Sequence, residues 1–281
     1  MLALDLWEHD ISVDLGYLAV HICECYAVPL GPIRPHDLKE LNDRDFDQAI
    51  VVNAKGDLIG GITAWRLEDL RRNNQELSQE EAVSGFKEIH NHCSLDVLLE
   101  FLSASKFGFI VEEHDAEQLG TYASVLGLLT IADLNKRYFR SLLYMILAEI
   151  EMAFAGLIMQ CCTDPNNKWL EKLGDDSLRR ILGFWQLSKF RNVEVDPIEY
   201  CNLTDLLVVT KKNPEIGRIL GNESSACIKR IRKQLPEWRN RVMHPVRPLI
   251  TSQGDIAALR NVLADIYSLG KRIYEIQPKS R

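Results

Sequence analysis

Two short apolar segments, 67 residues apart, end in the same way, and this repeat constrains the fold more than any other feature. Residues 58–63 read Leu-Ile-Gly-Gly-Ile-Thr, and residues 125–130 read Val-Leu-Gly-Leu-Leu-Thr. Apolar runs of this length, bounded by turn residues, are typical of buried strands. The first half of the chain is therefore predicted to contain two similar units.

Strand and helix patterns recur around each of these segments. The first repeat shows no clear opening helix between Arg34 and Gln48. Its glycines are interpreted as turn or bulge residues, because no Gly-Lys-Ser/Thr phosphate loop follows them. The predicted elements are a hairpin over 49–63 and a helix over 67–72, then a helix over 95–103 and strands over 109–111 and 124–130.

The second segment continues as Ile131-Ala132-Asp133-Leu134. The pattern apolar-apolar-Gly-apolar-apolar-Thr-x-x-Asp-apolar resembles the closing strand of the CBS (cystathionine β-synthase) domain, which leads into a helix. CBS domains occur in pairs, and the resemblance covers about residues 10–135. It implies a cleft between two repeats, where the Thr and the Asp hold the phosphate and ribose of an adenosine ligand.

The two repeats match this motif unequally. Thr130 and Asp133 match both positions, whereas the first repeat has Thr63 but carries Arg66 in place of the Asp. An arginine cannot accept a hydrogen bond from ribose hydroxyls. We therefore expect at most one competent nucleotide site among these four nucleotide-binding positions. The alternative is a CBS pair that serves only as a dimerisation disc.

Charge separates the two halves of the chain. Residues 1–135 carry 24 acidic and 9 basic side chains, and residues 136–281 carry 16 and 24, so the halves have net charges of -15 and +8. This asymmetry predicts two domains, 1–135 and 136–281, and makes the second a candidate for binding a polyanion. The alternative is that the basic half complements the acidic one.

The second half has the periodicity of amphipathic helices. The first of these follows Asp133 without a linker, which predicts one continuous helix over 131–160. The fold class is thus α+β, with a CBS pair of β-α-β-β-α units before an all-α bundle. The bundle is predicted to contain helices over 137–160, 168–189, 197–210, 223–243 and 254–276.

Basic side chains gather on the fourth predicted helix. Seven basic residues lie between Lys229 and Arg247, against the single acid Glu237. A solvated helix usually mixes signs, so this excess favours a phosphate backbone as partner. The predicted RNA-binding residues are Lys229, Arg230, Arg232, Lys233 and Arg241.

This helix ends in Arg239-Asn240-Arg241-Val242-Met243-His244-Pro245. An Arg-Asn-x3-His pattern is expected by chance only about 0.02 times in such a chain. It resembles the signature of the HEPN superfamily, helical bundles many of which are metal-independent endoribonucleases. The resemblance covers about residues 136–278 and implies a toxin or antiviral-defence ribonuclease with Arg239, Asn240 and His244 as catalytic residues.

RNA cleavage needs a base for the 2'-hydroxyl, a cation for the phosphorane and an acid for the 5'-oxygen. Histidine can act as base or acid, and arginine supplies the fixed charge. Since one His244 cannot serve both proton transfers, and the resemblance implies two facing motifs, we expect a homodimer or higher homo-oligomer. Alternatives are a HEPN bundle that binds RNA or protein without cleaving, a plain helix end at His244, and a metabolic enzyme with CBS allostery.

Composition bears on location and cofactors. Residues 1–10 carry no basic side chain, and Glu149 and Glu151 interrupt the longest apolar stretch, so we expect a cytoplasmic protein without a membrane segment. The seven cysteines contain no C-x-x-C pair, and His90 to Cys93 is interpreted as a loop rather than a metal site. We expect no catalytic cofactor and no metal, and a regulatory adenine nucleotide as the small ligand.

Overall fold

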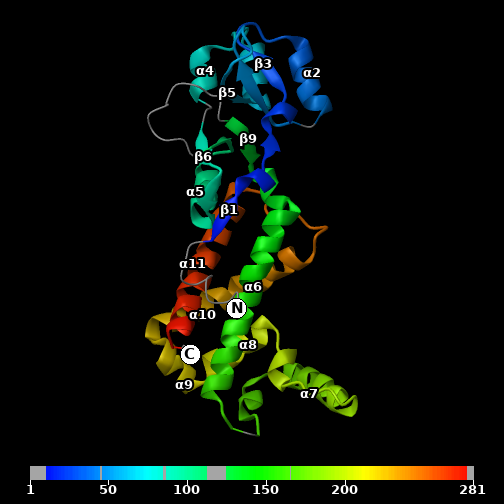
Figure 1. The fold of residues 1–281 in the computed structure, drawn as a ribbon, viewed down its shortest axis with the longest axis vertical. Coiled ribbons are helices and arrows are strands. Elements are labelled where there is room, and N and C mark those ends of the chain that lie inside the picture. Colours follow the sequence, from blue (N-terminus) through cyan, green and yellow to red (C-terminus); the bar gives the residue numbers. More distant parts are fainter. Residues whose placement is uncertain (1–10, 45, 85–86, 113–124, 165, 277–281) are drawn as a thin grey trace. The chain divides into compact units, whose positions relative to one another are not determined.

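The computed structural model describes residues 11–44, 46–84, 87–112, 125–164 and 166–276, and the chain divides into two compact units (Figure 1). The first contains Ile11–Tyr138 together with Ile250–Ala257, and the second contains Phe139–Leu249 and the chain from Ala258 onward. The charge asymmetry and the helical periodicity predict that residues 250–257 belong to the C-terminal half, whereas the structure places them in the first unit. The architecture is mixed α+β.

The first repeat is a small sheet with helices. Its strands are β3 (Ala27–Pro29), β4 (Gln48–Val52) and β5 (Leu58–Thr63), in the order β3-β4-β5, with β3 parallel and β5 antiparallel to β4. Helix α2 (Pro35–Asp43) connects β3 to β4, and α3 (Ala64–Arg72) follows β5. This is a β-α-β-β-α unit.

An opening helix is therefore present where the sequence showed none, between Arg34 and Gln48. Helix α2 lacks a conventional capping residue, and it buries only Asp37, Leu38 and Leu41. Two buried leucines give too little apolar periodicity to identify a helix. Proline at its first position was the available signal, because proline suits the first turn of a helix.

The second repeat has the same connectivity. Its strands are β6 (Glu88–His90), β8 (Phe107–Val111) and β9 (Val125–Thr130), with α5 (Leu95–Ala104) connecting β6 to β8. Strand β6 is parallel and β9 antiparallel to β8. The first compact unit also contains strand β1 (Ser12–Asp14), which pairs with β7 (His92–Ser94), and strand β2 (Val20–His21), which pairs with β9. Helix α4 (Gln79–Ser84) precedes β6.

Strand registers show that the repeats are equivalent position by position. Gln48 lies opposite Thr63 in the first sheet, as Phe107 lies opposite Thr130 in the second. Each pairing shifts register at the same step, between Val51 and Val52 and between Ile110 and Val111. The two apolar segments thus occupy equivalent places, as their similarity predicted.

Two equivalent glycines are required by close packing. A Cβ on Gly60 would lie 2.1 Å from the Ala82 carbonyl oxygen of α4, and a Cβ on Gly127 would lie 2.6 Å from the Val20 carbonyl oxygen of β2. Both distances are below any real Cβ contact. Each glycine therefore lets a neighbouring backbone approach its strand, a role of strand glycines that involves no phosphate.

The C-terminal unit consists of helices around an apolar core. Its fully buried side chains include Phe139, Phe154, Ile181 and Ile231. Its elements are α6 (Arg137–Cys161), α7 (Asp175–Phe190), α8 (Leu203–Lys212), α9 (Pro214–Leu220), α10 (Asn222–Met243) and α11 (Gln253–Ile276), with 3-10 helices at Lys168–Lys172 and Pro197–Tyr200.

Three helix predictions were wrong in detail. Residues 168–189 and 197–210 each divide into a 3-10 helix and an α-helix, and the separate helix α9 was not predicted. The predicted continuous helix over 131–160 is also interrupted. A 3-10 helix (Ile131–Asn135) ends at Lys136, whose backbone is extended, and α6 begins at Arg137.

Helix α6 is long and apolar enough to cross a membrane by length and composition, with 44% of its most apolar window buried. The buried core helix of a helical bundle can be just as long and as apolar. Nine of its residues are buried, and Glu151 forms an ion pair with Arg239 of α10. The absence of a membrane segment remains a prediction.

Candidate functional site

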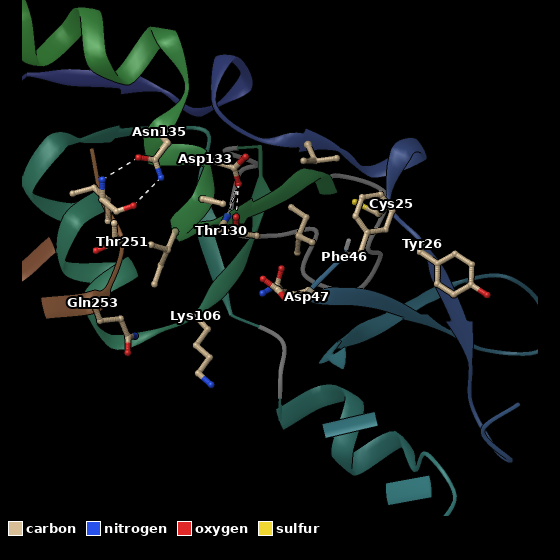
Figure 2. Close-up of a pocket in the computed structure, with 16 residues that line it drawn as sticks. Cys25, Tyr26, Phe46, Asp47, Lys106, Thr130, Asp133, Asn135, Thr251 and Gln253 are labelled. Carbon is tan, nitrogen blue, oxygen red and sulfur yellow. Dashed lines mark hydrogen bonds between the residues drawn. The ribbon is translucent and has the colours of Figure 1, made fainter. Parts of the chain in front are cut away.

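A cavity of about 600 Å³ opens in the first unit beside the closing turn of the second repeat (Figure 2). This volume lies within the range of small-molecule sites. The walls come from both repeats and from residues 250–253. The lining residues are Val20, Cys25, Tyr26, Phe46, Asp47, Gln48, Lys106, Leu128, Thr130, Ile131, Ala132, Asp133, Asn135, Ile250, Thr251 and Gln253.

Thr130 and Asp133 lie together in this wall. The carboxylate Oδ2 of Asp133 accepts from the backbone N–H of Thr130 at 2.7 Å and from its hydroxyl at 2.9 Å. Lys136 Nζ lies 2.8 Å from Oδ1, and the Asp133 side chain is only 5% exposed. A carboxylate offers about four acceptor positions, so Oδ1 retains capacity for one further donor.

The bonds between Asp133 and Thr130 cap the N-terminus of a short 3-10 helix, which ends before α6 begins. Because Asp133 folds back onto Thr130, the turn closes as a capping box. Lys136 leaves helical geometry, and its ammonium also donates to the carbonyls of Leu18 and Ala19. Asp133 is therefore a structural residue as well as a cavity residue.

Two charged side chains in the cavity were missed by the sequence analysis. Asp47 directly precedes β4, and Lys106 directly precedes β8, so they occupy equivalent positions in the two repeats. Both side chains are exposed, and Figure 2 labels them in the cavity. Their place immediately before each equivalent strand was the signal that could have identified them.

The remaining walls are largely apolar. Val20, Leu128 and Phe46 contribute hydrocarbon surface. Burial, followed by the charges of Glu24 and Asp133, raises the pKa of the Cys25 thiol to about 11. Cys25 is therefore a neutral thiol at physiological pH, which suits an apolar wall more than a reactive nucleophile.

Neither Thr63 nor Arg66 lines this cavity. The Thr63 hydroxyl accepts from the Arg66 backbone N–H at 3.2 Å and caps α3. The Arg66 guanidinium lies 2.5 Å from both Asp69 and Glu81, which hold it in ion pairs. The limit of one nucleotide site per pair remains a prediction.

The predicted catalytic residues lie at the C-terminal end of α10, in the second unit. Asn240 and His244 are exposed, and His244 is the capping residue, whose N–H donates to the Asn240 carbonyl at 3.1 Å. Arg239 Nε lies 3.0 Å from Glu151 Oε1 of α6, and its side chain is 41% exposed. The helix thus brings the three residues together within two turns.

Arg140 of α6 holds this helix end, a role the sequence did not indicate. Its guanidinium donates to the carbonyls of Arg241 and Val242, and to the Arg247 carbonyl at 2.8 Å. These carbonyls flank His244 on both sides. A cation at the C-terminus of a helix satisfies unpaired carbonyls and complements the helix dipole.

The predicted RNA-binding residues divide into two groups. Arg230 donates two hydrogen bonds to Asp265 at 2.9 and 2.6 Å, and Arg241 forms an ion pair with Glu237 at 2.7 Å while stacking over Trp238. These guanidiniums are engaged within the chain. Lys229 and Lys233 are exposed, and Arg232 is half-buried.

Within the described residues, no group of three or more His, Cys, Asp or Glu side chains is placed to hold a metal ion. His90 and Cys93, predicted to form a loop, instead lie on the short strands β6 and β7.

Comparisons with known proteins find structural similarity only. No family model and no curated protein matches the chain. The similar solved structures include a CBS domain-containing protein of unknown function from Bacillus anthracis (17% identity, 47% of this chain and 94% of that chain, TM-score 0.35). Another is a CBS domain protein from Shewanella oneidensis (22% identity, 43% and 92%, TM-score 0.33). A third is CbpB in complex with c-di-AMP (13% identity, 49% and 91%, TM-score 0.35).

Proposed function

We propose that the first unit binds an adenine nucleotide in the cavity beside Thr130 and Asp133 and that this ligand regulates the protein. The observation that carries the proposal is the cavity itself. It lies at the turn that resembles a nucleotide-binding motif, and it combines apolar walls with one exposed cation and two carboxylates. Half of the lining residues are polar or charged, and the others offer mainly apolar surface, so the cavity can contact both the base and the polar parts of a small ligand.

Each part of a nucleotide has a chemical counterpart here. Apolar side chains such as Leu128 and Phe46 suit the faces of a purine. The carboxylates of Asp47 and Asp133 suit ribose hydroxyls, because ionised carboxylates only accept hydrogen bonds. The Lys106 ammonium suits a phosphate, with which it makes a charge-assisted contact.

Calorimetry with AMP and ATP tests this proposal. We expect saturable binding by the full chain, and ATP binding by Lys106→Ala that is weaker by about tenfold or more, since one charge-assisted hydrogen bond contributes about 1.5–3 kcal/mol. Lys55→Ala is the matched control, because Lys55 is exposed in the hairpin turn of the same unit and does not line the cavity. No binding of either nucleotide, or an equal loss in both variants, would contradict the proposal.

As a second function, we propose that the helical unit cleaves RNA at Arg239, Asn240 and His244. The supporting observation is that His244 and Asn240 are exposed at a helix end that Arg140 holds in place. His244 takes the proton from a 2'-hydroxyl, whose oxygen attacks phosphorus, and the Arg239 guanidinium stabilises the phosphorane. The 5'-oxygen leaves with a proton, and the other RNA end keeps a 2',3'-cyclic phosphate.

End-group analysis of single-stranded RNA incubated with the purified protein in EDTA tests this chemistry. We expect cleavage with 2',3'-cyclic phosphate ends, abolished in His244→Ala and in Arg239→Ala. His36→Ala is the matched control, because His36 is an exposed histidine on helix α2 of the other unit. If EDTA abolished cleavage by the wild type, or if His244→Ala still cleaved RNA, the proposed chemistry would be contradicted.

RNA binding is proposed to use Lys229, Arg232 and Lys233, the members of the basic group that are not held in the ion pairs described above. Each neutralised phosphate releases a counterion, so the affinity is expected to fall steeply with salt. A homodimer would supply a second His244 for the second proton transfer. A salt-independent affinity, measured by fluorescence anisotropy, would favour a protein partner instead.

A further inference from the structure

Residues 250–253, which we call the cavity strap, reach the nucleotide cavity from the far end of the chain. Ile250, Thr251 and Gln253 line the cavity beside the closing turn of the second repeat. They lie more than 110 residues along the chain from Asn135, yet they belong to the same compact unit. Charge and periodicity had assigned this segment to the helical half.

One amide side chain holds the strap to the nucleotide turn. Asn135 Nδ2 donates to the Ile250 carbonyl at 2.9 Å, and Asn135 Oδ1 accepts from the Ile250 N–H at 2.9 Å. Figure 2 shows both bonds beside Thr130 and Asp133. Asn135 is the last residue of the 3-10 helix that begins after Thr130, so the strap is fixed to the same turn that lines the cavity.

Buried isoleucines lie on both sides of the exposed Thr251. Ile250 is 2% exposed, and Ile256 is fully buried. Between them, Thr251 donates from its N–H and its hydroxyl to Asp255 Oδ2, at 2.8 and 2.5 Å. The Thr251 side chain itself is exposed in the cavity wall, where a ligand can contact it.

We infer that the strap is a ligand-contacting wall of the nucleotide site and that nucleotide binding stabilises its attachment to the closing turn. The inference rests on the proposed nucleotide binding and adds the segment through which that binding acts. A ligand that contacts both the turn and the strap favours the attached state over the detached one, by the difference of its affinities for the two. The strap continues the chain from His244 through residues 245–249, so its attachment fixes one end of that segment.

Hydrogen exchange on the full chain tests the inference. The amides of Ile250 and Thr251 are both hydrogen-bonded, to Asn135 and Asp255, so their exchange reports opening of the strap. Saturating ATP is expected to slow their exchange about tenfold. Slower exchange at residues 26–48 and 128–133 without any slowing at 250–251 would overturn the inference and leave nucleotide binding intact. No ATP binding at all would overturn both.

A bulky side chain on the strap gives an independent test. Thr251→Trp is expected to weaken ATP binding at least tenfold, because the indole occupies the cavity from the strap side. Ala257→Trp is the matched control, since Ala257 is exposed on α11 in the same unit and does not line the cavity. Equal ATP affinities for the two variants, at unchanged thermal midpoints, would show that the strap is not part of the site.

Discussion

The two repeats share one topology and one strand register, but their closing turns differ in sequence and in helix type: Thr63 leads into α-helix α3, whereas Thr130 leads into a 3-10 helix. In the second repeat, Asp133 folds back onto Thr130 and faces a cavity. In the first, Arg66 stands at the equivalent place and turns to Asp69 and Glu81. Equivalent strand pairs therefore lead into a cavity wall in one repeat and into an ion-pair cluster in the other.

Packing deepens this difference. A Cβ at Gly61 would lie 2.7 Å from the Phe107 ring and 2.9 Å from the Phe109 ring. The equivalent residue of the second repeat is Leu128, which lines the cavity. Aromatic rings thus fill the space beside Gly61, and the larger Leu128 packs in the same cluster as these rings while it also lines the cavity.

The equivalent strand glycines are expected to give the largest effect. Gly60→Ala and Gly127→Ala place a methyl group against a backbone carbonyl, so each should lower the free energy of unfolding by about 3 kcal/mol. Chemical denaturation measures this. Gly183→Ala is the control, because nothing lies near its Cβ within helix α7, and it should stabilise by about 0.5–1 kcal/mol. Tolerance of alanine at Gly60 would contradict the packing described here.

Replacing Asp133 and replacing Arg66, the equivalent residues of the two closing turns, should lower the free energy of unfolding by different amounts. Asp133→Ala removes the acceptor of three donors around a buried turn, and should cost about 2–3 kcal/mol of unfolding free energy. Arg66→Ala removes two ion pairs between half-buried side chains that water still reaches, and should cost less than about 1 kcal/mol. Equal costs would show that the two turns are stabilised alike. Because Asp133→Ala is expected to destabilise the fold, a loss of nucleotide binding in this variant would not separate a binding role from a structural one.

Acidification should destabilise helix α2, the opening helix of the first repeat, more than helix α5 of the second repeat. Burial alone would raise the pKa of Asp37, but hydrogen bonds from Arg34 and Tyr26 hold it below its usual value. The stabilisation is therefore present above about pH 4 and lost as the pH falls through the lowered pKa. Helix α5 is capped instead by the Ser94 hydroxyl, which does not titrate.

We expect the stability difference between the wild type and Asp37→Asn to shrink below about pH 4 in denaturation series. For Ser94→Ala, the difference from the wild type should stay constant over the same range. A constant difference for Asp37→Asn would show that its carboxylate is not held in the charged form by Arg34.

Placing an aspartate at position 66, where the second repeat has Asp133, should have the smallest effect on binding. Arg66→Asp places a carboxylate beside Asp69 and Glu81, so unfolding free energy should fall by about 1 kcal/mol. No second nucleotide should bind in calorimetry, because Thr63 and Arg66 do not line the cavity. A second binding event in this variant would show that one residue alone separates the repeats.

The sequence revealed those parts of the fold and site that depend on local patterns. The repeat of Leu58–Thr63 in Val125–Thr130 predicted equivalent strands, and the resemblance at Thr130 and Asp133 implied a cleft, where the structure has a cavity. The break at Lys136 was not predictable from apolar periodicity, because polar bonds to Asp133 and to two distant carbonyls cause it.

Residues that reach the cavity or the end of α10 from distant parts of the chain could not be identified from the sequence. Thr251 and Gln253 join the cavity through a contact with Asn135, more than 110 positions away, and no local pattern signals such a pairing. Arg140 likewise holds carbonyls about 100 residues further along the chain. Charge along the chain was a guide to the two halves, but it placed residues 250–257 with the wrong unit.

The stoichiometry of nucleotide binding tests the central claim most directly. Calorimetric titration of the full chain with AMP should give one nucleotide per chain. Thr130→Ala should weaken that binding at least tenfold, and Thr63→Ala should leave it unchanged. Two nucleotides per chain, or binding that depends on Thr63 and not on Thr130, would contradict the assignment of the site to the second repeat.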